Sequence, residues 1–194
     1  MNTTTIHRPG LERRGFLASS GKLSAVAIAM LAGREALAQG MSGNAAQDVG
    51  ILNAALGLEH EAINAYQLGA GSGLLDKGVL AVALQFQGHH KAHRDALVAT
   101  IRKLGGQPAA ELRLDDYAKA LGASGLKSQS DVLDLAARLE LGAANAYIGV
   151  IPSFTDRQLS KVAARLAADE TLHYTVLTQA LGRPLPATAL SFGS

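Results

Sequence analysis

Four segments of the chain repeat apolar residues at positions i, i+3, i+4 and i+7, and this pattern constrains the fold more than any other feature of the sequence. Such spacing places the apolar side chains on one face of an α-helix. The composition agrees, because 48% of the residues are hydrophobic while only 4% are aromatic and Trp is absent. This balance favours helices packed on helices over a β-sandwich. We therefore expect an all-α fold.

Local start and stop signals divide these segments into four long helices. We expect them at about residues 48–68, 75–103, 130–151 and 155–181, with a short helical piece at 116–121 in the long connection. Asp48 and Ser130 are the predicted N-caps of the first and third helices, and residues 155–158 have the form of a capping box. Two short connections and one long crossover predict a four-helix bundle over residues 48–182. A flexible segment, 39–47, is expected before the bundle and a tail, 183–194, after it.

Each apolar stripe is interrupted once by acidic or histidine residues. The interrupting residues are Glu59 in the first helix, His90 and His93 in the second, Glu140 in the third, and Glu170 and His173 in the fourth. At a rise of about 1.5 Å per residue, every interruption lies roughly 20 Å from the hairpin loop of its own helix pair. Packing the antiparallel helices together therefore predicts that the six side chains meet in one layer of the core.

Three converging carboxylates need compensating positive charge, because a buried carboxylate without a partner costs several kcal/mol. No Lys or Arg lies on the four apolar stripes. A divalent metal with carboxylate and imidazole ligands would supply this charge. Cys is absent, so thiolate ligands, disulfides and Cys nucleophiles are excluded. The alternatives are solvated carboxylates on a loosely packed face and hydrogen-bonded core imidazoles.

An internal repeat supports a paired site. Leu58, Glu59 and the Asn-Ala-Tyr at 64–66 recur as Leu139, Glu140 and the Asn-Ala-Tyr at 145–147, at an offset of 81 residues. Asp76, His93 and Leu97 of the second helix match Asp156, His173 and Leu177 of the fourth at an offset of 80. The two halves therefore read as copies of one helical hairpin, related by a pseudo-two-fold axis.

With these residues, the chain resembles the ferritin-like superfamily and, within it, bacterial ferritin-like domain proteins related to desiccation-associated proteins. The resemblance covers about residues 48–181 and implies a di-iron site, with one Glu from each of two helices and a Glu-x-x-His from each of the other two. Glu59 and Glu140 match the lone carboxylates, Glu170 and His173 match one Glu-x-x-His, and His93 matches the other histidine.

His90 departs from this pattern, because it stands where the family has a Glu that helps to bridge two metals. A neutral imidazole offers one lone pair to one ion. A single iron or manganese ion, an altered pair of ions, or a relic site without metal are the alternatives that this substitution leaves open.

Residues around the cluster have less specific signals. His89 is expected to contact a ligand from outside or to lie on the surface. Tyr66 and Tyr147 either hydrogen-bond to the ligands or are core aromatics with the hydroxyl at an edge. His60 and Glu61 point away from the face that carries Glu59, so we expect both in solvent.

Residues 1–38 have the features of a signal peptide. Arg13, Arg14, Phe16 and Leu17 resemble the twin-arginine export motif, and Ala36 and Ala38 form a small-x-small cleavage site. The resemblance implies twin-arginine export machinery as a partner, folding before export, and a bacterial periplasmic location. The alternative is a basic, apolar anchor that is never cleaved.

The charge of the chain gives little support for nucleic-acid binding. The formal charge is +2, but five of the 18 basic side chains and two of the 16 acidic ones lie in residues 1–38, so the remainder is at −1. No apolar run in the body of the chain has the length of a membrane-spanning helix. No stable membrane insertion is therefore expected after cleavage, whereas a homo-oligomer stays open.

Three functions from different classes fit these observations. The first is a metal-binding protein that uses iron or manganese in redox chemistry, such as ferrous oxidation or peroxide disposal. The second is a non-catalytic stress or envelope protein with a degenerate metal site. The third is iron storage in a hollow shell, for which an exported chain with an incomplete site is a poor candidate.

Overall fold

The computed structural model describes residues 43–193, which contain helices and no strand. Four long helices form a bundle: α3 (Gly43–Gly71), α4 (Lys77–Lys103), α6 (Gln129–Val150) and α7 (Arg157–Ala180). A short helix, α5 (Leu114–Ala120), and the turn η1 (Ala123–Gly125) lie in the crossover, and the turn η2 (Ile151–Ser153) precedes α7. The predicted ferritin-like four-helix bundle is confirmed.

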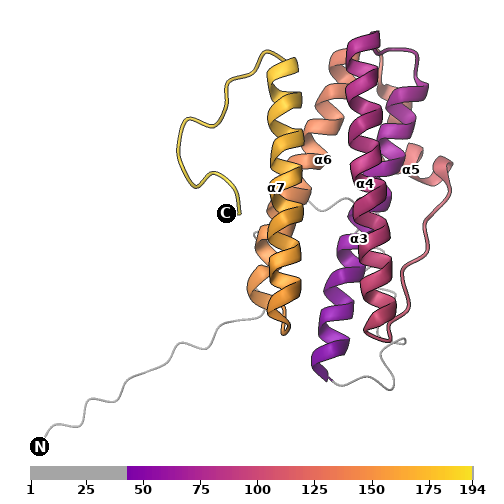
Figure 1. Ribbon diagram of the computed structural model, residues 1–194. Coiled ribbons are helices and arrows are strands. Elements are labelled where there is room, and N and C mark those ends of the chain that lie inside the picture. The colour runs from indigo at the N-terminus through magenta and orange to yellow at the C-terminus, as the bar shows by residue number, and fades with distance from the viewer. Residues whose placement is uncertain (1–42, 194) are drawn as a thin grey trace, which may run out of the picture.

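The bundle consists of two helical hairpins, α3 with α4 and α6 with α7, which have the most extensive helix–helix contacts. The crossover at 104–128 runs along the length of the bundle before α6 begins (Figure 1). As a result, the two hairpin loops lie at opposite ends, and residues near the middle of all four helices come to the same depth.

The apolar core is split into two clusters. One contains Leu56, Leu97 and Tyr147, and the other contains Phe86, Leu133 and Leu177. In each helix, the interrupting Glu and His residues lie between the segments that supply the two clusters. The polar layer is therefore enclosed by packed apolar residues on both sides.

The first helix begins earlier than its sequence signals indicate. Residues 43–47, predicted as part of a flexible segment, are helical, and the predicted N-cap role of Asp48 is wrong because this residue lies inside α3. The Asp48 carboxylate is buried and accepts hydrogen bonds from Thr155 N at 2.8 Å, Thr155 Oγ1 at 2.6 Å and Asp156 N at 3.2 Å. It stabilises the loop before α7 instead.

Two other predicted caps are displaced by a few residues. Ser128, not Ser130, caps α6 by accepting a hydrogen bond from Asp131 N. The predicted capping box is not formed, because the Thr155 hydroxyl donates to Asp48 and Asp156 caps α7 through Gln158 N. Where several neighbouring polar residues could cap a helix, the backbone conformation of the loop determines which of them does so.

The prediction that His60 and Glu61 face solvent is wrong. They are 4% and 2% exposed. The crossover packs against the outer side of α3, where α5 contacts the helix and Asn64 Nδ2 donates to Glu111 Oε1 at 2.6 Å. Helix α3 is therefore covered on nearly every side, which an amphipathic pattern alone does not predict.

Within residues 43–193, no helix is both long enough and apolar enough to cross a membrane. The predicted signal peptide, with Arg13, Arg14, Phe16, Leu17, Ala36 and Ala38, lies outside the described residues.

Candidate metal centre

Six side chains from the four helices meet in the polar layer, and they are the six that interrupt the apolar stripes. Their polar atoms form two overlapping groups, in each of which all ligand atoms lie within 4.8 Å of one another. The first group is Glu59, His90, His93 and Glu170, and the second is His90, Glu140, Glu170 and His173. The side chain of His93 is 11% exposed and the other five are at most 3% exposed. The cluster is thus buried, with His93 at its most accessible edge.

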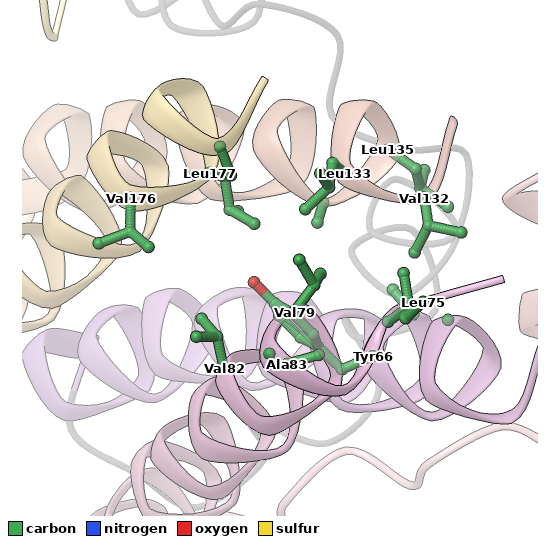
Figure 2. Close-up of a pocket in the computed structure, with 15 residues that line it drawn as sticks. Tyr66, Leu75, Val79, Val82, Ala83, Val132, Leu133, Leu135, Val176 and Leu177 are labelled. Atoms are coloured by element: carbon green, nitrogen blue, oxygen red, sulfur yellow. The ribbon is translucent and has the colours of Figure 1, made fainter. Parts of the chain in front are cut away.

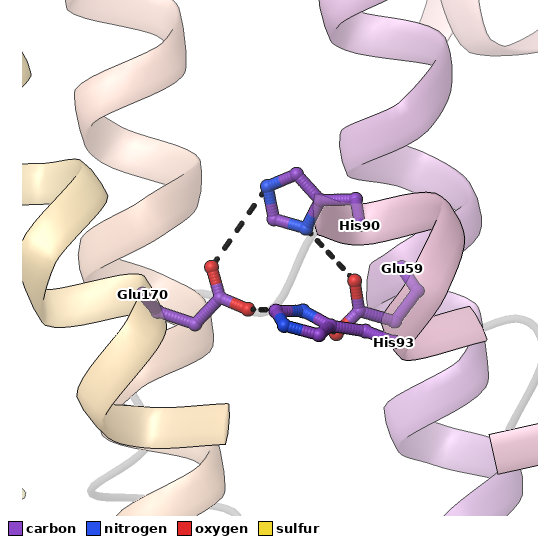
Figure 3. A group of neighbouring side chains, drawn as sticks. All are labelled: Glu59, His90, His93 and Glu170. Atoms are coloured by element: carbon purple, nitrogen blue, oxygen red, sulfur yellow. Dashed lines mark hydrogen bonds and ion pairs between the residues drawn. The ribbon is translucent and has the colours of Figure 1, made fainter. Parts of the chain in front are cut away.

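His90 lies at the centre of the cluster and faces carboxylates with both ring nitrogens (Figure 3). Its Nδ1 is 2.8 Å from Glu59 Oε2, and its Nε2 is 3.2 Å from Glu140 Oε1 and 3.8 Å from Glu170 Oε2. Two nitrogens that both face carboxylate oxygens fit an imidazolium that donates on both sides. A metal ligand, by contrast, needs one nitrogen without a proton.

Glu170 is shared by the two groups, with one oxygen turned toward each. Its Oε1 is 3.3 Å from His93 Nδ1, and its Oε2 is 3.3 Å from His173 Nδ1. Both oxygens are fully buried, yet neither has a hydrogen bond of good geometry, and the same holds for His93 Nδ1. Buried oxygen and nitrogen atoms that face each other without a well-aligned proton between them fit a divalent cation with mixed ligands.

Two tyrosines exchange hydrogen bonds across the pseudo-two-fold axis. Tyr66, from the first half of the repeat, donates its hydroxyl proton to Glu140 Oε1 at 2.5 Å, and Tyr147, from the second half, donates to Glu59 Oε1. Burial, together with the neighbouring carboxylates, raises the pKa of both tyrosines well above the usual value. Both phenols therefore stay protonated and fix one oxygen of each lone carboxylate.

The protonation states of the cluster are set by competition between burial and ion pairing. Burial favours a raised pKa for Glu59, but His90 and His93 outweigh it and lower this pKa to about 2. For His93, burial opposes protonation, but Glu170 and Glu59 raise its pKa to about 10. Carboxylates raise the pKa of His90 and His173 in the same way. The metal-free cluster therefore compensates its own charges through imidazolium–carboxylate pairs.

Glu170 differs from the other two carboxylates. Burial raises its pKa, and its histidine neighbours do not fully offset this effect. The pKa of Glu140, in contrast, falls well below the usual range, because His173 and His90 outweigh burial. Glu170 is thus the carboxylate whose negative charge is least compensated in the metal-free protein.

Two partly exposed groups contact the cluster from outside. His89 is exposed, and its Nδ1 lies 2.9 Å from His173 Nε2. Asp169, which does not lie on an apolar stripe, has its Oδ2 3.2 Å from His93 Nε2 and a side chain that is 51% exposed. Each of these contacts fixes the ring orientation of a cluster histidine. The one signal for Asp169 in the sequence is that it is an acidic residue directly before Glu170.

A four-helix bundle with a long crossover and a buried layer of Glu and His is the architecture of ferritin-like proteins. The family model described as ferritin-like domain matches residues 47–183, so the chain belongs to this family.

A crystal structure of a conserved hypothetical protein from Mycobacterium tuberculosis has the same fold. It superimposes with a TM-score of 0.60 at 23% sequence identity, and the match covers 75% of this chain and 99% of that one. Comparison with curated proteins found no match.

Proposed function

We propose that this ferritin-like protein binds one iron or manganese ion in the Glu/His cluster and uses it in redox chemistry with oxygen or peroxide. The main support is Glu170, whose two buried oxygens lack aligned hydrogen-bond donors and each face a histidine nitrogen. A bound iron or manganese ion would supply one-electron redox chemistry at this position.

The proposal of a single ion rests on His90. Both ligand groups include this residue, together with Glu170. A neutral imidazole has one lone pair, and its other nitrogen carries a proton. An ion in one group therefore removes His90 from the other group. The ion would be held either by Glu59, His90, His93 and Glu170, or by His90, Glu140, Glu170 and His173.

Metal content tests this proposal directly. We expect about one iron or manganese ion per chain in protein purified from its native host, where the cell's own metal supply applies. The variant His90→Glu adds a carboxylate that can span two ions, so its iron content should rise towards two per chain, with faster ferrous oxidation. Wild-type protein without metal, together with a variant that gains none, would contradict the proposal.

A second candidate function is favoured by the self-compensated charges of the cluster. The pKa shifts of Glu59, Glu140 and the three histidines show that these five side chains compensate one another's charges without metal. Such a bundle would serve as a non-catalytic envelope protein related to the desiccation-associated proteins. In that case His90→Glu would remove the central imidazolium, add a fourth buried carboxylate and lower stability by a few kcal/mol without gain of iron.

Export is part of the proposal. The Arg13–Arg14 pair with Ala36 and Ala38 downstream supports recognition by the twin-arginine machinery and a periplasmic location. Replacing both arginines with lysine and fractionating the cells tests this step. Loss of periplasmic protein is expected, and an undiminished periplasmic fraction would contradict the assignment.

A further inference from the structure

An apolar pocket lies between the two hairpins, next to the Glu/His cluster. It has a volume of about 110 Å³ and is lined by residues from α3, the start of α4, the start of α6 and the end of α7. Figure 2 shows Leu75, Val79 and Val82 of one hairpin facing Leu133 and Leu177 of the other. Tyr66 carries the only side-chain oxygen or nitrogen among the 15 lining residues.

Water is a poor occupant of this pocket. A buried water needs two to four polar partners, and cavities lined by aliphatic side chains stay dry and bind small apolar molecules. The Tyr66 hydroxyl proton is already donated to Glu140. The lining therefore provides shape and apolar contact, and almost no hydrogen bonding.

The size and the opening of the pocket limit what can enter. An apolar cavity of about 150 Å³ accommodates benzene with space to spare, so a space of about 110 Å³ suits a small hydrocarbon of about five carbons and is too small for a helix. Among the lining residues, Val176 is 42% exposed, and Gly78 and Ala180 are also exposed. The lining therefore reaches solvent at residues of both α4 and α7.

Tyr66 connects the pocket to the cluster, and Phe86 contacts both Tyr66 and a cluster histidine. Tyr66 lines the pocket and bonds to Glu140, while Phe86 stacks on the His173 ring at a centroid distance of 4.1 Å and packs edge-on against Tyr66 at 6.2 Å. A molecule in the pocket would thus contact a residue that is hydrogen-bonded to a proposed metal ligand.

We propose that this pocket is a binding site for a small aliphatic molecule, held directly beside the Glu/His cluster. The site is formed by the packing of the protein's own side chains, so binding does not require a metal. It goes beyond the proposed metal-dependent function, and the two can fail independently.

Cyclopentane is a suitable probe, with tetrahydrofuran as its matched polar counterpart of similar size. Titration is followed by NMR of isotopically labelled Leu and Val methyl groups in the metal-free full-length protein. The methyl signals of Val79, Leu133 and Leu177 should shift saturably with cyclopentane. Binding of tetrahydrofuran should be about tenfold weaker, because its ether oxygen would be buried without a donor.

Variants that fill the pocket provide the control. Ala136→Leu should abolish the saturable shifts, and Ala83→Val, a smaller change, should weaken them if Ala136→Leu does not fold. Ala168→Leu, on the exposed side of α7, should bind cyclopentane as the wild type does. The same titration on metal-loaded protein tests whether binding in the pocket is independent of metal binding. Because the pocket does not require a metal, saturable shifts are expected in the metal-free protein whether or not the cluster binds an ion.

Three results would overturn the assignment: lining methyl groups that do not respond, equal binding by Ala136→Leu, or equal binding of both probes. Lining methyl signals that depend on protein concentration without any probe would overturn it as well, since they would show that a second copy of the chain covers the pocket.

Discussion

At the residue scale, the cluster is organised by pairs that cross from one half of the repeat to the other. Each lone carboxylate is bonded to the tyrosine of the opposite half, and His90 lies between Glu59 and Glu140. Glu59, His90 and Glu140 are therefore satisfied by one another and by the two tyrosines, which explains how this part of a buried polar layer coexists with a stable bundle, whereas both oxygens of Glu170 lack aligned donors.

The crossed tyrosines should stabilise the metal-free protein. Tyr147→Phe removes a buried hydrogen bond to a charged carboxylate, and such bonds contribute about 1.5–3 kcal/mol. We expect a loss of that size in urea unfolding, with an unchanged m-value. Tyr66→Phe should have a similar effect, because it removes the equivalent hydrogen bond to Glu140. Tyr174→Phe, outside the cluster, is the control, and a loss as large in Tyr174→Phe would refute this account.

The two carboxylates Glu59 and Glu170 should respond differently to neutralisation. Glu59 has a pKa lowered to about 2, so Glu59→Gln should destabilise the metal-free protein by roughly 3 kcal/mol, since one pKa unit corresponds to about 1.4 kcal/mol. The pKa of Glu170 is raised, so Glu170→Gln should leave the melting temperature unchanged or raise it. Metal affinity should fall at least about tenfold in both variants. Equal destabilisation by the two variants would contradict the assigned charges.

At the element scale, contacts made by the crossover and loops decide which faces of the helices are buried. The crossover covers the outer side of α3 and buries His60 and Glu61. The start of α7 depends on α3 in a similar way, because Asp48 accepts three hydrogen bonds from residues 155 and 156.

Asp48 should therefore contribute more to stability than an ordinary helix cap. Asp48→Ala leaves three donors of the α7 loop without their acceptor, and we expect a loss of about 2–4 kcal/mol in denaturant unfolding. Asp156→Ala removes one cap of α7 and should cost about 1 kcal/mol. If Asp48→Ala costs no more than Asp156→Ala, the loop is held by other contacts.

At the scale of the whole molecule, the cluster links stability to pH. The raised pKa of His93 stabilises the folded protein. This stabilisation is complete below pH 6.5 and is lost as the pH rises through about 10. The lowered pKa of Glu59 also stabilises the folded protein. This second stabilisation is complete above pH 4.5 and is lost as the pH falls through about 2. The metal-free protein should thus be most stable between pH 4.5 and 6.5. Melting temperatures measured from about pH 2 to about pH 10 test it, and the control Glu59→Gln should lose less stability on the acid side than the wild type does.

The same charges predict that metal binding releases protons. An ion in either ligand group needs two neutral histidines, and all three histidines have a raised pKa. We expect about two protons released per ion at pH 7, and tighter binding as the pH increases. Calorimetry in two buffers of different ionisation enthalpy counts the protons, and a count near zero would contradict the imidazolium assignment.

Sequence periodicity carried most of the fold and the identity of the cluster. An α-helix has 3.6 residues per turn, so residues three or four positions apart share a face whatever surrounds the helix. The positions of Glu59, His90, Glu140 and Glu170 on buried stripes therefore follow from local geometry. Matching distances from the hairpin loops then predicted one layer, and the internal repeat predicted its pairing. The pocket, Asp169 and the role of Asp48 have no comparable local signal.

What only the tertiary structure decided concerns contacts between segments distant in the sequence. Whether His60 is buried depends on the path of the crossover, and whether Asp48 caps its own helix or holds the loop before α7 depends on how the hairpins pack. The charge of the cluster is decided in the same way: Glu and His become ion pairs only when four helices bring them within about 3–4 Å and exclude water, because both the attraction and the desolvation cost depend on distance and burial.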